Sequence, residues 1–313
     1  MWPRRVAVVA ATGALLVLPI EASAAGWLSD LFKSSQKAAK AHARVASRKP
    51  AHHTKHVAAT KPHPVRLASL EPPDLSRLAL ESSPYGCDPL KFRIVLDVGH
   101  TADSEGAISS RNVPEFAFNL NLARQIEQKL KAAFPETRLI VTEGRAKPSL
   151  FTRVATASRL HANLLLSVHH DSVPNKFLEN WDFDGKKSHF SDRFSGFSVW
   201  VSRDNPQFRT SLSFAELIGK QMKAQGLQYA QQYTDPIMGH YRFPLLDKDD
   251  GVYAHDELIV LRKSQMPAVL LEAGSIINRD EELKMTSPER QDAISNAVVT
   301  AAKDFCPAYL GPM

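Results

Sequence analysis

Short apolar runs alternate with amphipathic stretches over the second two thirds of the chain. The runs are rich in Val, Ile and Leu and short, a composition typical of parallel strands that are buried on both faces. Six strands are therefore predicted, at 92–98, 139–141, 164–169, 197–201, 258–261 and 269–271.

The stretches between these runs carry helical periodicity. Helices are predicted from Pro114 to Phe134, from a Ser149 cap to His161, over 211–224, and from Ser287 onward. Strands that alternate with helices predict one α/β domain with a mostly parallel twisted sheet and helices on both of its faces.

Two long segments interrupt this alternation. Residues 173–195 and 233–257 are polar and aromatic and show no clear period. Loops of this length are usually functional or disordered. Both follow segments that are expected near a functional site at the ends of the strands, so we interpret them as walls of a substrate pocket or as a lid.

The first 89 residues differ in composition from the rest. Residues 1–24 have an early Arg pair, an apolar stretch and small residues for cleavage, which predicts a secretory signal peptide and no membrane anchor after its removal. Residues 25–89 form a basic His-, Ala- and Pro-containing linker that is expected to be disordered. One globular domain is predicted at 90–307 and a short tail at 308–313.

The charge of the chain is concentrated at its N-terminal end. The net charge is +6, yet residues 91–313 contain as many acidic as basic residues. A basic tail on an exported chain suits acidic envelope polymers or anionic lipids, and a solvated tether is an equal alternative. Export also argues against nucleic acid as a partner.

The two cysteines lie at the ends of the predicted domain. Cys87 precedes its first strand and Cys306 follows its last helix. A pair of cysteines in an exported protein favours a disulfide over two free thiols. Such a bond would tie the two ends of the domain together.

Candidate catalytic side chains occur where apolar runs end. His100 and His169 close two of the runs, Glu272 follows a third, and Glu115 begins a predicted helix. In open α/β sheets, ligands bind at the carboxyl ends of the strands, so these residues are expected at one site.

The residue types suit metal-assisted hydrolysis. Zinc hydrolases use three His or carboxylate ligands and leave one position for water, whose pKa the metal lowers. His100, Glu115 and His169 fit the ligand roles, and Glu272 fits the group that carries the proton. Spacing alone supports only hydrolysis of an amide or an ester.

The motifs around these residues resemble one known family. The segments Asp97–His100, Glu105–Ile108, Ser167–His169, Leu261–Arg262 and Pro267–Gly274 are similar to D-P-G-H, G-A-I, S-I-H, V-L-R and P-A-V-L-V-E-x-G. In this order they resemble the zinc-dependent N-acetylmuramoyl-L-alanine amidases of the amidase 3 type, over about 92–305.

The resemblance implies a function and assigns the residue roles. It implies one Zn²⁺ per domain on His100, Glu115 and His169, with Glu272 as the catalytic carboxylate. The substrate would be peptidoglycan, cut between N-acetylmuramic acid and L-alanine for wall remodelling or daughter-cell separation. The location would be the periplasm or the cell envelope.

Several residues depart from the family pattern or are further candidates. The usual G-H-G-G is Gly99–Ala102 here, and His170 stands beside His169 as a rival ligand. Because side chains alternate along a strand, only one of the two should face the metal. A role behind the ligands or toward substrate is expected for the following residues: Asp97, His170, Asp171, Arg242 and Arg262.

Two other functions share these sequence features. A zinc peptidase acting within the stem peptide would have the same site and a different pocket. A non-catalytic wall-binding regulatory domain would not need all four site residues, and all four are present. If residues 173–195 block the site, an activator protein would be required.

Overall fold

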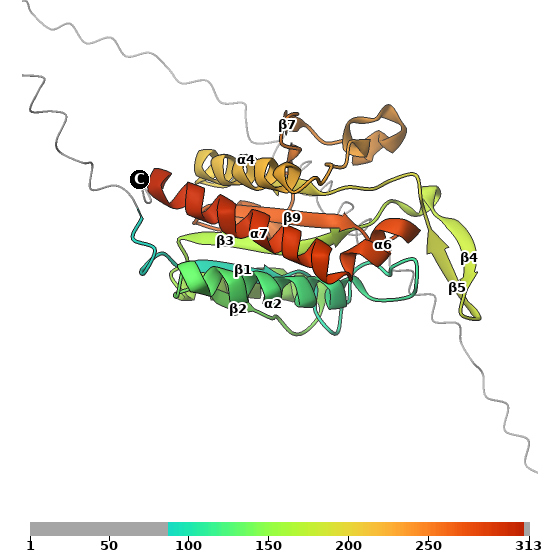
Figure 1. The fold of residues 1–313 in the computed structure, drawn as a ribbon, viewed down its shortest axis with the longest axis horizontal. Coiled ribbons are helices and arrows are strands. Elements are labelled where there is room, and N and C mark those ends of the chain that lie inside the picture. The colour runs from blue at the N-terminus through green and yellow to red at the C-terminus, as the bar shows by residue number, and fades with distance from the viewer. Residues whose placement is uncertain (1–86, 310–313) are drawn as a thin grey trace, which may run out of the picture.

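The computed structural model describes residues 87–309, which fold around a seven-stranded sheet (Figure 1). Its strands are, in spatial order, β2 (Arg138–Ile140), β1 (Ile94–Val98), β3 (Leu164–Asp171), β9 (Ala268–Ser275), β6 (Ser198–Val201), β8 (Val252–Ala254) and β7 (Leu245–Asp247). The first four are mutually parallel, whereas β6 pairs antiparallel with β9 and β7 antiparallel with β8. The mostly parallel sheet predicted from the sequence is confirmed.

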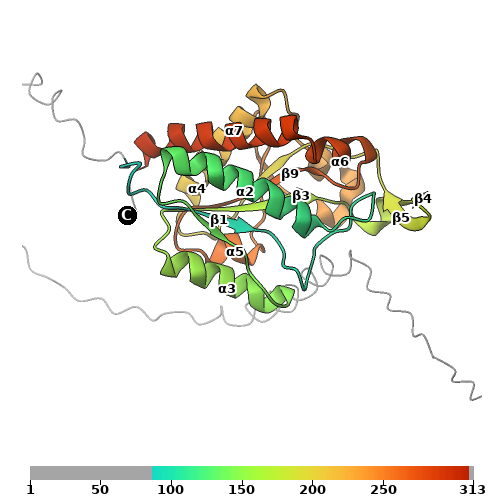
Figure 2. The same cartoon turned by 60° about the horizontal axis from the view of Figure 1, so that its bottom comes forward.

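Helices cover both faces of this sheet. On one face lie α2 (Glu115–Ala133), α4 (Phe208–Ala224) and α7 (Pro288–Phe305), and on the other lie α3 (Ala146–Arg159) and α5 (Ile259–Lys263) (Figure 2). A further helix, α6 (Arg279–Met285), lies between β9 and α7. Two covered faces explain why the strands are apolar at nearly every position.

The side chains of each central strand divide between two cores. In β3, Leu164, Leu166 and Val168 join the core beneath α2 and α7, whereas Leu165 joins the core beneath α3 and α5. The same alternation continues to the end of the strand, so that His169 and its neighbour His170 belong to opposite faces.

The helix starts follow the sequence signals with one exception. Pro114 precedes α2, and the Ser287 side chain accepts a hydrogen bond from the backbone N–H of Arg290 at the start of α7. The expected Ser149 cap is wrong, because α3 begins at Ala146. The Ser149 hydroxyl instead donates to the Ala146 carbonyl within the first turn.

The strand predicted at 258–261 is wrong. This segment leads into helix α5, and the backbone N–H of Arg262 donates to the carbonyl of Leu258. Four apolar residues cannot distinguish a strand from a buried helical turn. Val260 and Leu261 are buried in the core beneath α3.

The two long segments are more ordered than predicted. Residues 173–195 contain a hairpin of β4 (Glu179–Phe183) and β5 (Lys186–Phe190), joined by Asp184 and Gly185, which both have positive φ. Residues 233–257 include β7, β8 and the 3-10 turn at Pro236–Tyr241. Short 3-10 turns also occur at Asn175–Phe177, Gln232–Thr234 and Cys306–Ala308.

A disulfide closes the described domain. Cys87 and Cys306 are joined, which ties the segment before β1 to the end of α7. The predicted signal peptide and linker lie outside the described residues, except for positions 87–89, and so do positions 310–313 of the predicted tail. Among residues 87–309, no helix combines the length and apolarity needed to cross a membrane.

Candidate metal centre and active site

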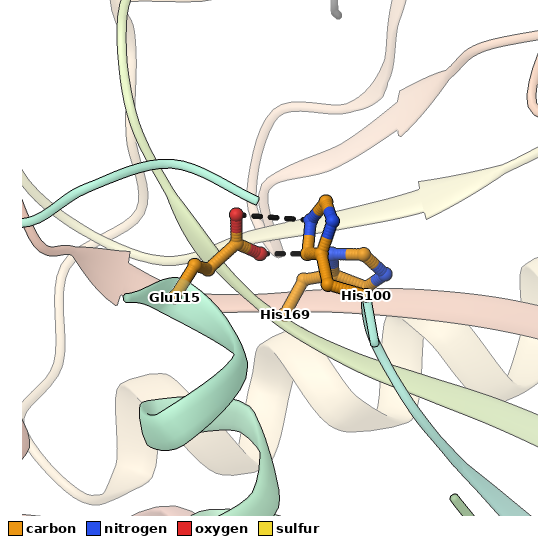
Figure 3. A group of neighbouring side chains, drawn as sticks. All are labelled: His100, Glu115 and His169. Atoms are coloured by element: carbon orange, nitrogen blue, oxygen red, sulfur yellow. Dashed lines mark hydrogen bonds and ion pairs between the residues drawn. The ribbon is translucent and has the colours of Figure 1, made fainter. Parts of the chain in front are cut away.

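Three elements bring the candidate ligands together at the carboxyl edge of the sheet. His100 lies two residues after β1, His169 lies near the end of the adjacent β3, and Glu115 is the first residue of α2 (Figure 3). Because β1 and β3 are hydrogen-bonded neighbours, their ends place the two imidazoles side by side.

The Glu115 carboxylate faces both imidazoles. Its Oε2 lies 3.0 Å from Nε2 of His100, and its Oε1 lies 3.0 Å from Nδ1 of His169. One potential ligand atom from each residue lies within 4.8 Å of the other two. Two imidazoles and one carboxylate are the donor set of several zinc hydrolases, so these side chains fit a zinc ion.

Hydrogen bonds from α2 and its preceding loop fix the Glu115 carboxylate. The Asn119 amide donates to Oε1 at 3.1 Å, and the backbone N–H of Ala107 donates to Oε2 at 3.1 Å. Asn119 is fully buried and also donates to the carbonyl of Gly99. Asn119 therefore connects the helix that carries Glu115 to the loop that carries His100.

Two glycines allow the backbone to approach the candidate ligands closely. A Cβ on Gly99 would lie 2.5 Å from the His169 ring, and one on Gly106 would lie 2.6 Å from both Glu115 Oε2 and the His100 ring. His100 itself has a φ of 66°, a conformation that costs free energy for a residue with a side chain. The backbone of the loop is therefore strained at His100, the residue that it directs toward Glu115 and His169.

Burial and mutual contact set the charges of these groups. Burial alone would raise the pKa of Glu115, but the two imidazoles hold the pKa of that carboxyl well below its usual value. Burial lowers the pKa of His169 despite the neighbouring carboxylate. An ionised carboxylate and a neutral imidazole are the forms that bind metal.

Glu272 lies beside the candidate ligands in the sheet. It is paired in register with His169 and belongs to the same face, above α3 and α5. Its Oε2 is buried and accepts no hydrogen bond from the described residues. Burial raises the pKa of Glu272 well above its usual value, and the nearby carboxylates of Asp171 and Glu115 raise it further.

Asp171 is the third buried carboxylate at this edge. A register shift between β3 and β9 follows His169, as is common beside active sites, and it leaves Asp171 facing Tyr233. The Tyr233 hydroxyl donates to the Asp171 carboxylate at 2.5–2.6 Å. Burial nevertheless raises the pKa of Asp171 to about 7.

His170 lies on the opposite face from His169. It is 2% exposed, packs against Phe118, and its Nδ1 lies 2.8 Å from Oδ1 of Asn119. Burial lowers the pKa of His170 to about 4. The side chain therefore supports Asn119 from behind and has no route to a substrate.

Asp97 holds a buried arginine. Arg153 from α3 donates to Asp97 Oδ1 at 2.6 Å, and the Ser167 hydroxyl donates to Oδ2 at 2.8 Å. The same guanidinium also donates to the carbonyls of Val98 and His100. Asp97 therefore fixes the backbone that presents His100, through Arg153.

A cavity of about 220 Å³ adjoins the candidate ligands. Both His100 and His169 line it, together with residues of α3 and Val260 of α5. Among the described residues, neither Arg242 nor Arg262 lines it. Arg242 is exposed, and its Nε donates to the carbonyl of Thr234.

Sequence analysis did not single out several residues of this site. Asn119 lies four residues after Glu115, so a helical repeat places both on one face. Gly106 lies within the Glu105–Ile108 motif, and Arg153 lies in the helix predicted from Ser149 to His161. Asn119 contacts a partner only four residues away, whereas Arg153 lies 56 residues from its partner Asp97.

An α/β sheet with two imidazoles and a carboxylate at its carboxyl edge, and a further buried carboxylate beside them, is an arrangement typical of metal-dependent hydrolases. A profile of the N-acetylmuramoyl-L-alanine amidase family matches residues 94–304. The chain belongs to this family.

Known proteins agree with this assignment. A Buchnera aphidicola protein that carries the provisional name N-acetylmuramoyl-L-alanine amidase is 25% identical over 225 residues, which are 68% of this chain and 95% of that protein. An N-acetylmuramoyl-L-alanine amidase of Mycobacterium tuberculosis is 23% identical, over 64% of this chain and 73% of its own length.

A solved structure shares the fold. The crystal structure of an N-acetylmuramyl-L-alanine amidase from Mycobacterium smegmatis superposes with a TM-score of 0.54 at 20% sequence identity. The match covers 71% of this chain and 99% of the other. The described α/β domain therefore corresponds to a complete domain of that structure.

Proposed function

We propose that the domain is a zinc-dependent enzyme that hydrolyses the amide between N-acetylmuramic acid and L-alanine in peptidoglycan. The observation that carries the proposal is the cluster of His100, Glu115 and His169 within a chain of the amidase family. Cell-wall remodelling and daughter-cell separation are the processes that such a reaction serves.

The proposed cofactor is one Zn²⁺ held by His100, Glu115 and His169. When bound, a zinc ion lowers the pKa of a water molecule and polarises a carbonyl oxygen. The protein supplies the orientation, because Asn119 and the N–H of Ala107 fix the Glu115 carboxylate before any ion arrives.

The proposed proton carrier is Glu272. Its buried Oε2, which no described residue engages, is available to accept a proton from the attacking water. The raised pKa of Glu272 favours retention of that proton until it is returned to the leaving nitrogen. The pairing of Glu272 with His169 in the sheet supports this role, because it keeps the carboxyl group close to the proposed metal ligands.

The hairpin in 173–195 bears on the need for an activator. The Trp181 indole and the Ser188 hydroxyl both donate to the carbonyl of Ser110, which anchors β4 and β5 to the loop before α2. Among the described residues, the cavity beside the candidate ligands is lined by none from 173–195. These contacts favour an open site and activity without an activator protein.

The proposed location is the periplasm or the cell envelope. Peptidoglycan lies outside the cytoplasm, so its hydrolase must be exported. Residues 1–24 would act as the signal peptide and 25–89 as a basic tether to the envelope. The Cys87–Cys306 bond suits an oxidising compartment of this kind.

The test is the digestion of purified peptidoglycan by the purified chain, with zinc or with a chelator. The variants are Glu272→Gln, which preserves size, and Glu289→Gln, a matched control at an exposed position of α7. Mass spectrometry of the soluble products should detect intact stem peptides with a free N-terminal alanine. These products should disappear with chelator and in Glu272→Gln, and persist in Glu289→Gln.

Other outcomes would support the other functions. Cuts within the peptide would establish a zinc peptidase and refute the amidase. Binding to the wall without any released product, in the presence of zinc, would indicate a non-catalytic wall-binding domain.

A further inference from the structure

The cavity beside the candidate ligands lies between the metal centre and the start of α3. His100 and His169 line one side of it, and Lys147, Ser149 and Leu150 line another. A substrate whose scissile amide lay at the candidate metal centre would have room here for one of its two flanking groups. The residues of this second wall would then contact either the sugar or the peptide.

Lys147 gives this wall a positive charge that does not contribute to a salt bridge among the described residues. It is exposed. The residue before the helix is Arg145, and the first turn of α3 contains no acidic residue. Cations at a helix N-terminus oppose the helix dipole, so these two side chains do not stabilise α3.

A second, buried cation lies deeper in the same cavity. Arg153 is 2% exposed and lines the cavity. Its two terminal nitrogens are engaged by Asp97, Val98 and His100, but its Nε has no hydrogen-bond partner among the described residues. Asp97, which also lines the cavity, pairs with this guanidinium, so Lys147 is the lining cation that has no acidic partner among the described residues.

Part of the remaining surface is apolar, and Asp97, Thr101 and Ser104 also line the cavity. Leu150 from α3 and Val260 from α5 both line it. An apolar wall close to the metal centre and a cation at the rim together match a small aliphatic residue followed by an acidic one. The sugar side of the scissile amide offers no such match, since its lactyl carboxyl group is consumed in the amide itself.

We propose that this cavity binds the first two residues of the stem peptide and that Lys147 recognises a free carboxylate on the second. L-Alanine packs against Leu150 and Val260, and the carboxylate of the following acidic residue meets the Lys147 ammonium. Lys147 is thus a specificity residue that distinguishes the carboxylate from its carboxamide. This inference rests on the proposed amidase function.

The test compares two substrates and two product peptides. The substrates are muramoyl peptides whose second residue carries either a free carboxylate or a carboxamide, and the peptides are the corresponding alanyl dipeptides. The variants are Lys147→Gln, the conservative Lys147→Arg, and Lys303→Gln as a matched control on exposed α7. We would measure kcat and KM for each substrate and, by calorimetry, the Kd of each dipeptide for the zinc-loaded chain.

We expect Lys147→Gln to lower kcat/KM for the carboxylate substrate by about tenfold, mainly through a higher KM. This is the loss expected for one hydrogen bond to a charged group. The Kd of the acidic dipeptide should rise by a similar factor, whereas the carboxamide forms should be unaffected. Lys147→Arg should retain most of the preference, and Lys303→Gln should retain all of it.

Equal effects on the carboxylate and the carboxamide, or no effect on either, would overturn the inference even if the enzyme is an amidase. If no amide is cleaved but the acidic dipeptide binds through Lys147, the proposed function fails while the inference stands. If the wild-type chain does not prefer the acidic dipeptide and its substrate, the inference is wrong.

Discussion

Gly106 offers a direct test of how closely the loop before α2 packs against the metal centre. Its φ is 83°, in the left-handed region that glycine tolerates best. In Gly106→Ala the new Cβ would lie 2.6 Å from Glu115 Oε2 and 2.6 Å from Cδ2 of the His100 ring. Either these side chains or the loop must move.

Two separate penalties follow from this substitution. The left-handed backbone costs roughly 1–2 kcal/mol for a residue with a Cβ, which lowers the Tm of a domain of this size by about 2–8 °C. Relief of the two contacts to ordinary van der Waals separation requires a displacement of close to 1 Å. Sites of this kind tolerate only about 0.5 Å, so the zinc affinity should fall by roughly 10–100-fold.

Gly226 provides the matched control. It follows α4, its φ is 78°, and a Cβ there would meet nothing within 4 Å. Gly226→Ala therefore carries the backbone penalty without the contacts. Calorimetry of the metal-free proteins would measure Tm, and competition with a chromophoric chelator would measure the Kd for zinc.

The Tm should decrease by a similar amount in both variants, and the zinc affinity should decrease only in Gly106→Ala. If Gly106→Ala binds zinc as tightly as the wild-type chain, then Glu115 and His100 are not the ligands or the loop is compliant. A loss of zinc affinity in Gly226→Ala as well would show that general destabilisation, and not the local contact, is responsible.

Three further perturbations test the energetics of the domain. Burial lowers the pKa of His255 from its usual 6.5 to about 4, so the unfolded chain takes up the proton first and stability falls as pH drops through this window. In His255→Gln the decrease in unfolding free energy between pH 7 and pH 4 should be smaller than in the wild-type chain by up to about 3 kcal/mol, as measured by urea unfolding at the two pH values. Replacing Cys87 and Cys306 with Ser should cost at most about 5 kcal/mol of unfolding free energy, from the entropy of a loop with a sequence separation of 219 residues. Metal-free Glu272→Gln should have a higher Tm than the metal-free wild-type chain, because a buried group repelled by other carboxylates is removed, and a lower Tm would contradict that reading.

The central sheet could be predicted because both of its faces are covered. The runs at 92–98 and 164–169 are apolar at most positions, and so they stand out from the polar helix surfaces. Their polar ends then marked His100 and His169, and strand alternation separated His169 from His170. The structure places these two histidines on opposite faces, as that argument requires.

The errors occur where local pattern carries little information. Helix α5 is too short to show a helical period, and only its packing under α3 decides its conformation. The β4–β5 hairpin had a usable signal, since Asp184–Gly185 suits a two-residue turn and Trp181 alternates with exposed neighbours. Long-range partners such as Tyr233 for Asp171 depend on the assembled fold, which no local pattern encodes.

The carboxyl edge of the sheet concentrates negative charge where a soluble domain would normally avoid it. Glu115, Asp171 and Glu272 are all at least half-buried there, and Tyr233 and the two imidazoles offset only part of the repulsion. Burial of carboxylates without full compensation destabilises a fold. A divalent cation on His100, Glu115 and His169 would supply the missing charge and would favour the ionised form of Glu272 that accepts a proton. If the proposed metal ion binds there, the same arrangement that weakens the metal-free domain would make metal binding strongly stabilising.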